Sequence, residues 1–264
     1  MIRWLLLLIL GLSGLPAAGL GEGLDAEIES RLRHLVAVYP DALQRIDGDT
    51  LVWRDGTRMP VVDGRGPKSL LQRLESADLA DMVLETYPLG ASGLPPARDA
   101  DPGRARNAAF FDKMYGDCRQ GQVQKALVAI VWLPKKWGRK LMVSPQNGVA
   151  AQLQAISREL DGLPATFDTF LFPPAGTFNC RDVAGTTRKS AHGHGIAIDL
   201  VAAQSDYWRW AKPDAAGLRP YRNRIPPEIV EIFERHGFIW GGKWSHYDTM
   251  HFEYRPELLP ASPR

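Results

Sequence analysis

The sequence predicts an α+β fold in which a small, largely antiparallel sheet is flanked by helices, with an N-terminal helical and hairpin extension. After residue 104, short strand-like and helical segments alternate irregularly, and no run of repeated strand and helix units is present. The 264 residues are 45% hydrophobic with a formal net charge of +2, as in globular proteins large enough to bury a core. Because so small a charge gives no basic field, we expect no nucleic-acid partner.

Residues 1–19 are typical of a secretory signal peptide. Arg3 is the only charge before Glu22, and the apolar run 4–12 is too short to cross about 30 Å of hydrocarbon. Small residues at 17–19 suit cleavage, although a short buried helix or an uncleaved anchor is the alternative. No later stretch is long enough for a membrane span. We therefore expect an exported protein, periplasmic or secreted, without a membrane span after cleavage.

The following residues, 20–103, form the expected N-terminal extension and linker. Helical periodicity begins this region and returns over 69–85. Between these helices, 51–53 and 59–61 flank Asp55-Gly56 and predict a hairpin, with Pro60 on an edge strand. The stretch 90–103 has no periodicity and predicts a linker or long surface loop.

The remaining chain supplies the elements of the expected α+β domain. Helices are predicted over 147–160, where Gly162 ends the helix, and over 227–236, before Gly237. Short strands are predicted from apolar and β-branched runs at 126–133, 166–172, 196–201, 238–240 and 250–254.

The two cysteines, Cys118 and Cys180, are expected to meet an oxidising compartment after export. A pair of thiols there more often forms a disulfide than stays free, so we expect Cys118 and Cys180 to pair. Two buried free thiols are the alternative, whereas cysteines 62 positions apart lack the short spacing of a structural zinc site.

Two segments, 190–199 and 240–254, combine histidines with carboxylates. His192 lies in a glycine-rich loop, and Asp199 lies in an apolar strand, where a carboxylate is costly unless it is paired or bound to a metal. If 250–254 is a strand, His251 and Glu253 point to one face, and Asp248 lies just before it. Two histidines and one aspartate would make a zinc site that keeps a fourth position for water.

The motifs Ser190-x-His192-x-x-Gly195-x-Ala197-x-Asp199, Gly237-Phe238-x-Trp240-Gly241-Gly242-x-Trp244 and Asp248-x-x-His251-Phe252-Glu253 together resemble a known family. It is the bacterial D-alanyl-D-alanine carboxypeptidase and L-alanyl-D-glutamate endopeptidase family of zinc peptidases, whose fold hedgehog signalling domains share. The resemblance is clear over 180–254 and begins near Ala126. It implies a zinc peptidase domain over 104–258, followed by a C-terminal tail at 259–264.

The resemblance also implies a role for individual residues. His192, Asp199 and His251 correspond to the ligands of one zinc ion, and Asp248 corresponds to the general base. Arg181 looks like the upstream arginine with which the family holds substrate or stabilises charge; a surface arginine in a turn is the alternative.

Other residues near the motifs are candidates for supporting the site or contacting substrate. Ser190 is expected to be a hydrogen-bond partner of the site, because no base is spaced to activate it as a nucleophile. His194 either lines the cleft or is an exposed loop histidine. The remaining candidates are His246, which would touch substrate or donate a proton, Trp244 as a packing residue or cleft wall, and Glu253 as a support of the site.

These features lead to a functional hypothesis. The chain is expected to be an exported zinc metallopeptidase that hydrolyses a peptide bond in peptidoglycan stem peptides or cross-links, as a carboxypeptidase or an endopeptidase, with peptidoglycan or muropeptides as substrate. The alternative is a catalytically silent, zinc-containing module that binds the cell wall or a partner. Asp248 favours the enzyme, because a silent module has no need of a base. The sequence carries no signal of an oligomeric state.

Overall fold

The computed structural model describes residues 24–215, 217 and 219–260, so the signal-peptide prediction for residues 1–19 lies outside the described residues. The helices are α1 (Ala26–Val38), α2 (Leu70–Glu75), α3 (Leu79–Val83), α4 (Ala108–Tyr115), α5 (Gln122–Ala126), α6 (Val149–Asp161), α7 (Asp168–Leu171) and α8 (Pro227–Arg235). The strands are β1 (Leu43–Asp47), β2 (Thr50–Trp53), β3 (Arg58–Pro60), β4 (Val128–Trp132), β5 (Arg139–Val143), β6 (Ala197–Asp199), β7 (Phe238–Trp240) and β8 (His251–Tyr254).

Within the described residues, the strands form three small antiparallel sheets. Their orders are β1-β2-β3, β4-β5 and β6-β8-β7. Helices lie around these sheets, and the predicted α+β class is confirmed. None of the helices in the described part has the length and hydropathy needed to cross a bilayer.

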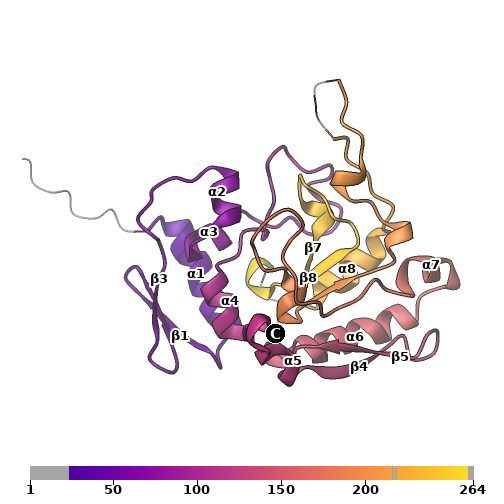
Figure 1. The fold of residues 1–264 in the computed structure, drawn as a ribbon, viewed down its shortest axis with the longest axis horizontal. Helices are drawn as coiled ribbons and strands as arrows, with labels where there is room; N and C mark the ends of the chain where they lie inside the picture. Colours follow the sequence, from indigo (N-terminus) through magenta and orange to yellow (C-terminus); the bar gives the residue numbers. More distant parts are fainter. Residues whose placement is uncertain (1–23, 216, 218, 261–264) are drawn as a thin grey trace, which may run out of the picture.

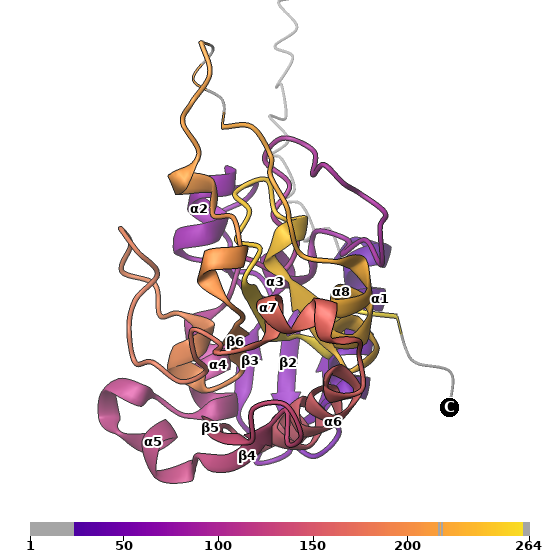
Figure 2. The ribbon, with the colours of Figure 1, turned by 90° about the vertical axis from the view of Figure 1, so that its right-hand side faces the viewer.

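The three sheets occupy different parts of the molecule (Figure 1). The N-terminal elements α1–α3 and β1–β3 lie on one side, and β7, β8 and α8 lie on the other. A layer made of β4, β5, α5 and α6 lies below β7, β8 and α8, and the turned view in Figure 2 also shows it at the bottom of the molecule. The site described below is built on the sheet of β6, β8 and β7.

The N-terminal elements and the later part of the chain share one hydrophobic core. Leu32 of α1 and Tyr39, which directly follows this helix, are buried in the same cluster as Phe110 of α4 and Phe252 of β8. Hydrogen bonds cross this boundary as well, because the Tyr39 hydroxyl donates to Glu257 (2.7 Å). Residues on both sides of the predicted domain boundary near residue 103 therefore belong to one continuous hydrophobic core.

Two predicted elements differ from the structure. The predicted strand at 166–172 is wrong: a 3-10 turn (Ala165–Phe167) runs into helix α7. The predicted helix at 69–85 is interrupted, because Ser69 and Asp78 each cap a separate short helix through their side-chain oxygens.

Candidate metal centre and active site

The site is built on the pairing of β6 with β8. In this antiparallel pair, Asp199 at the end of β6 lies directly opposite His251 at the start of β8. Directly opposed residues of such a pair bring their side chains within contact distance. His192 approaches from the 3-10 turn η4 (Ala191–His194), which Ser190 begins by accepting a hydrogen bond from the His192 amide (3.4 Å).

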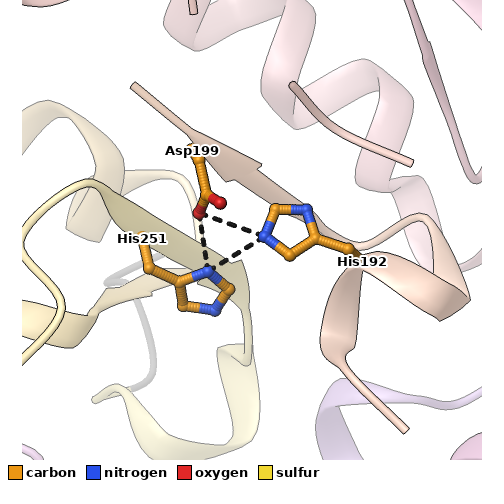
Figure 3. Close-up of side chains that lie close together, drawn as sticks. All are labelled: His192, Asp199 and His251. Atoms are coloured by element: carbon orange, nitrogen blue, oxygen red, sulfur yellow. Dashed lines mark hydrogen bonds and ion pairs between the residues drawn. The ribbon is translucent and has the colours of Figure 1, made fainter. Parts of the chain in front are cut away.

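The three side chains converge on one point, as Figure 3 shows. Asp199 Oδ1 lies 3.0 Å from His192 Nε2 and 2.9 Å from His251 Nδ1, and the two nitrogens are 3.2 Å apart. These residues, called the metal cluster below, offer two imidazole nitrogens and one carboxylate oxygen within 4.8 Å of one another. This donor set suits zinc, which accepts nitrogen and oxygen ligands.

The opposite nitrogen of each imidazole is held by an acceptor. His192 Nδ1 is paired with the backbone carbonyl of Thr177, and His251 Nε2 with Glu253 Oε2 at 3.0 Å. Each acceptor favours a proton on the nitrogen it faces, which leaves His192 Nε2 and His251 Nδ1 free as ligands. The residues present therefore fit a bound metal ion, and Glu253 lies on the same face of β8 as His251.

The charges around the cluster also favour a cation. Although burial opposes a charge on His251, hydrogen bonds with Asp199 and Glu253 raise the pKa of its imidazole to about 10. Burial also opposes ionisation of Asp199, but the two imidazoles hold the pKa of this carboxyl well below its usual range. The field that favours a proton at this position favours a metal dication as well.

Asp248 lies beside the metal cluster in the same cavity, which has a volume of about 180 Å³ and is called the metal cavity below. Its Oδ1 is buried without a hydrogen-bond partner among the described residues. Burial, and then the neighbouring Asp199 carboxylate, raise the pKa of Asp248 to about 6. A carboxyl with such a pKa can accept a proton near neutral pH, as a general base must.

Two glycines allow the backbone to approach closely here. A Cβ atom on Gly241 would lie 2.5 Å from the backbone oxygen of Asp248, so a larger residue would displace the segment that carries this carboxylate. Gly195, which follows η4, has φ +68°, a conformation that favours glycine. It turns the chain from His192 into β6.

Two further predicted residues, Arg181 and Trp244, line the metal cavity. Trp244 is buried, and its ring centroid lies 5.6 Å from that of His251, so the indole forms a wall beside the ligand. Arg181 is exposed, and among the described residues the only hydrogen bond of its side chain is a long one to the Asp182 carbonyl (3.4 Å). Its guanidinium is therefore accessible at the rim.

Two other candidates do not line the metal cavity. His194 is 2% exposed and lies 2.9 Å from Asp112 Oδ1, so the expectation of an exposed loop histidine is wrong. His246 is hydrogen-bonded through Nδ1 to Asp101 Oδ2 (2.8 Å), a residue of the long loop that precedes α4.

Sequence analysis missed the arginines that line the metal cavity together with Arg181. Arg104, Arg106 and Arg188 all contribute to its wall. Arg104 pairs with Asp101 at 2.7 Å, and Arg106 pairs with Glu253, the partner of His251. Arg104 and Arg106 lie at the end of the aperiodic stretch, where the only signal was a pair of arginines two positions apart.

The disulfide lies close to this site. Cys118 and Cys180 are joined in the structure, and this bond connects the turn before α5 to the loop that leads to His192. A Cβ atom on Gly193 would lie 3.2 Å from Cys118 Sγ, so the disulfide packs directly against η4.

Comparison with known proteins agrees with the motif analysis. Residues 184–254 match the family described as D-alanyl-D-alanine carboxypeptidase, and the suspected family is thereby supported. This segment contains the whole metal cluster together with Asp248, Trp244 and Glu253. No curated protein and no solved structure matches the chain. The match indicates a peptidase of the D-alanyl-D-alanine carboxypeptidase type.

Proposed function

We propose that the chain is an exported zinc metallopeptidase that hydrolyses a peptide bond in peptidoglycan stem peptides or cross-links. The observation that carries this proposal is the convergence of His192, Asp199 and His251 in one cavity with Asp248, whose Oδ1 has no hydrogen-bond partner among the described residues. The family match supports the peptidase class, and the predicted signal peptide supports export to the compartment that holds this polymer.

His192, Asp199 and His251 would hold the zinc ion. When bound, zinc supplies Lewis acidity, which makes a water molecule easier to deprotonate and a peptide carbonyl easier to attack. Asp248 accepts the proton of the attacking water and delivers it to the leaving amine. Arg181, at the rim, would hold substrate or stabilise the negative charge that develops on the carbonyl oxygen.

Glu253 and Ser190 act through the ligands rather than on the substrate. Glu253 fixes the His251 ring, and Ser190 begins the turn that carries His192. Trp244 limits access of water to the cluster from its side. His194 and His246 are assigned no contact with the reacting groups, because they bind Asp112 and Asp101 instead.

The test is incubation of purified muropeptides with zinc-loaded mature protein and with chelator-treated protein, followed by mass spectrometry. We expect a new fragment only with the zinc-loaded form, and its mass identifies the bond that is cut. Restoration of activity by added zinc separates loss of metal from loss of fold. No product from cross-linked or uncross-linked fragments, with zinc confirmed bound, would instead favour the silent binding module.

A further inference from the structure

A second and larger cavity adjoins the metal cavity. It has a volume of about 540 Å³, which lies within the range of small-molecule sites. Its walls come from both ends of the chain: Met59 and Glu75 from the N-terminal elements, and Phe111 and Lys189 from the later part. Arg106 and Arg188 line both cavities, so the larger one, called the lateral cavity below, lies directly beside the metal cavity.

Several charged side chains of the lateral cavity are neutralised by close partners. Lys189 is paired with both Asp112 and Asp117. Arg119 pairs with Asp182, and Arg106 pairs with the buried Glu253. These pairs leave little free charge on that part of the wall.

Arg188 is weakly neutralised by comparison. Its side chain is 12% exposed, and its Nε is buried without a hydrogen bond to any residue that the structure describes. The carboxylate that faces it is Glu75 Oε1, 3.4 Å from Nε and on a side chain that is 37% exposed. Burial, and then the neighbouring charges of Arg106 and Arg104, lower the pKa of Arg188 to about 10. A well-placed anion here would relieve this repulsion and satisfy the guanidinium.

We propose that the lateral cavity is a substrate subsite in which Arg188 binds a carboxylate of an acidic peptide, displacing Glu75. The class of ligand rests on the proposed function. A stem peptide linked through the γ-carboxyl of a glutamate keeps a free α-carboxylate, which suits a guanidinium at the junction of the two cavities. Glu75 and Arg106 lie outside the matched segment 184–254, so this subsite belongs to the N-terminal elements as much as to the peptidase segment.

Two peptides that differ only at this group test the proposal. One carries the free glutamyl α-carboxylate and the other its carboxamide, and both are titrated by calorimetry into the zinc-loaded Asp248→Asn protein, so that turnover does not interfere. A charge-assisted hydrogen bond contributes about 1.5–3 kcal/mol, so we expect the acid to bind roughly ten-fold more tightly or better. Arg188→Gln, in the same background, should abolish this preference.

Arg119→Gln is the matched control, because Arg119 lines the same cavity but is exposed and paired with Asp182. It should leave the preference unchanged. Glu75→Gln removes the competing carboxylate, so it should tighten binding of the acid several-fold and leave the amide unaffected. This variant changes an exposed side chain and remains informative if Arg188→Gln fails to fold.

Equal binding of the two peptides, no binding of either, or an equal loss of both in Arg188→Gln would overturn the subsite. Failure of the proposed function looks different. In that case muropeptides are not cleaved by the zinc-loaded protein, while the preference for the acid and its dependence on Arg188 remain. If muropeptides are cleaved but the acid peptide binds no more tightly than the amide peptide, the subsite is wrong and the proposed function stands.

Discussion

Glu253 is hydrogen-bonded to His251 Nε2, the ring nitrogen that faces away from Asp199 and His192 in the metal cluster. The carboxylate is completely buried and is itself held by Arg106 and Arg255. Such partners of a ligating histidine typically change metal affinity 10- to 100-fold. The matched family segment ends at Tyr254, so Arg106 is a support that the chain adds from outside it.

We predict that Glu253→Gln weakens zinc binding by about 10- to 100-fold, because the amide loses the charge that orients His251 and neutralises both arginines. Competition with a chromogenic chelator measures this affinity. Glu234→Gln is the control, since Glu234 is also a buried glutamate but binds Tyr87 instead. Unchanged zinc affinity in Glu253→Gln would contradict this role.

Asp101 holds the long loop before α4 in place. Its side chain is fully buried, pairs with Arg104, and accepts hydrogen bonds from the backbone and ring of His246. Burial raises the pKa of a carboxyl, but the bond from His246 and the charge of Arg104 outweigh it and hold the pKa of Asp101 below its usual range. A depressed pKa of this kind stabilises the fold above the ordinary aspartate pKa of about 4, and the contribution is lost as pH falls through the folded-state pKa.

Asp101→Asn should therefore lower the free energy of unfolding by about 3 kcal/mol at pH 7, because it leaves Arg104 buried without its partner. The difference in the free energy of unfolding between Asp101→Asn and the unsubstituted protein should become smaller as the pH falls below about 4. Urea unfolding at pH 7, 5, 4 and 3 measures both. A difference that stays constant over this range would show that the Asp101 charge is not the source.

The disulfide covalently links the 3-10 turn before α5 (Cys118–Gln120) to the loop that leads to His192. It closes a loop over a sequence separation of 62 residues. Chain-entropy arguments assign a bridge of this length about 4 kcal/mol. Because the bridge packs against η4, its loss should affect the approach of His192 as well as global stability.

The double variant Cys118→Ser/Cys180→Ser should accordingly unfold at a clearly lower temperature than the oxidised protein, by several degrees or more. Calorimetry of both proteins, with and without a reductant, is the measurement. Reductant should lower the melting temperature of the unsubstituted protein to that of the variant, and it should leave the melting temperature of the variant unchanged. Identical melting temperatures in all four samples would contradict the assignment.

The elements that sequence analysis predicted correctly are those with local signals. The pair Asp55-Gly56 lies in the turn between β2 and β3, and Gly162 directly follows Asp161, the last residue of α6. The strand β5 was missed because Arg139–Val143 has no alternating pattern, and its pairing with β4 creates the strand. The segment 166–172 is rich in aromatic and β-branched residues, yet it forms a turn and helix α7.

The site also combines residues with local sequence signals and residues that only long-range packing brings together. The metal cluster was predictable because its residues lie in two short motifs, and the register of β6 with β8 then brings Asp199 opposite His251. The positions of Arg104, Arg106 and Arg188 around the cavity depend on long-range packing, which spacing along the chain does not encode. The binding of His194 and His246 to Asp112 and Asp101 likewise joins segments more than 80 residues apart.

For the molecule as a whole, the N-terminal elements are part of the hydrophobic core rather than an appendage. Leu32, Leu35 and Tyr39 are at most 2% exposed and pack in one cluster with residues of the matched segment 184–254. Tyr87 donates to Glu234 of α8 and accepts from the Trp240 amide, so the extension is also bonded to β7. Removing it would expose a large apolar surface.

A chain that begins at residue 104 should therefore fail to fold cooperatively, because it loses the apolar residues that cover α4 and β8. Circular dichroism during heating measures this, with the mature full chain as reference. A sharp thermal transition and normal zinc affinity in the shortened chain would show that residues 104–258 form an independent domain.

We propose that the metal cluster and Asp248 together form a hydrolytic site. The most direct measurement compares muropeptide hydrolysis by the zinc-loaded protein and by Asp248→Asn, with the zinc content of each determined. We expect Asp248→Asn to keep its zinc and to lose activity by about 10²- to 10⁴-fold, as for loss of a general base. Hydrolysis at an unchanged rate by zinc-loaded Asp248→Asn would contradict this proposal.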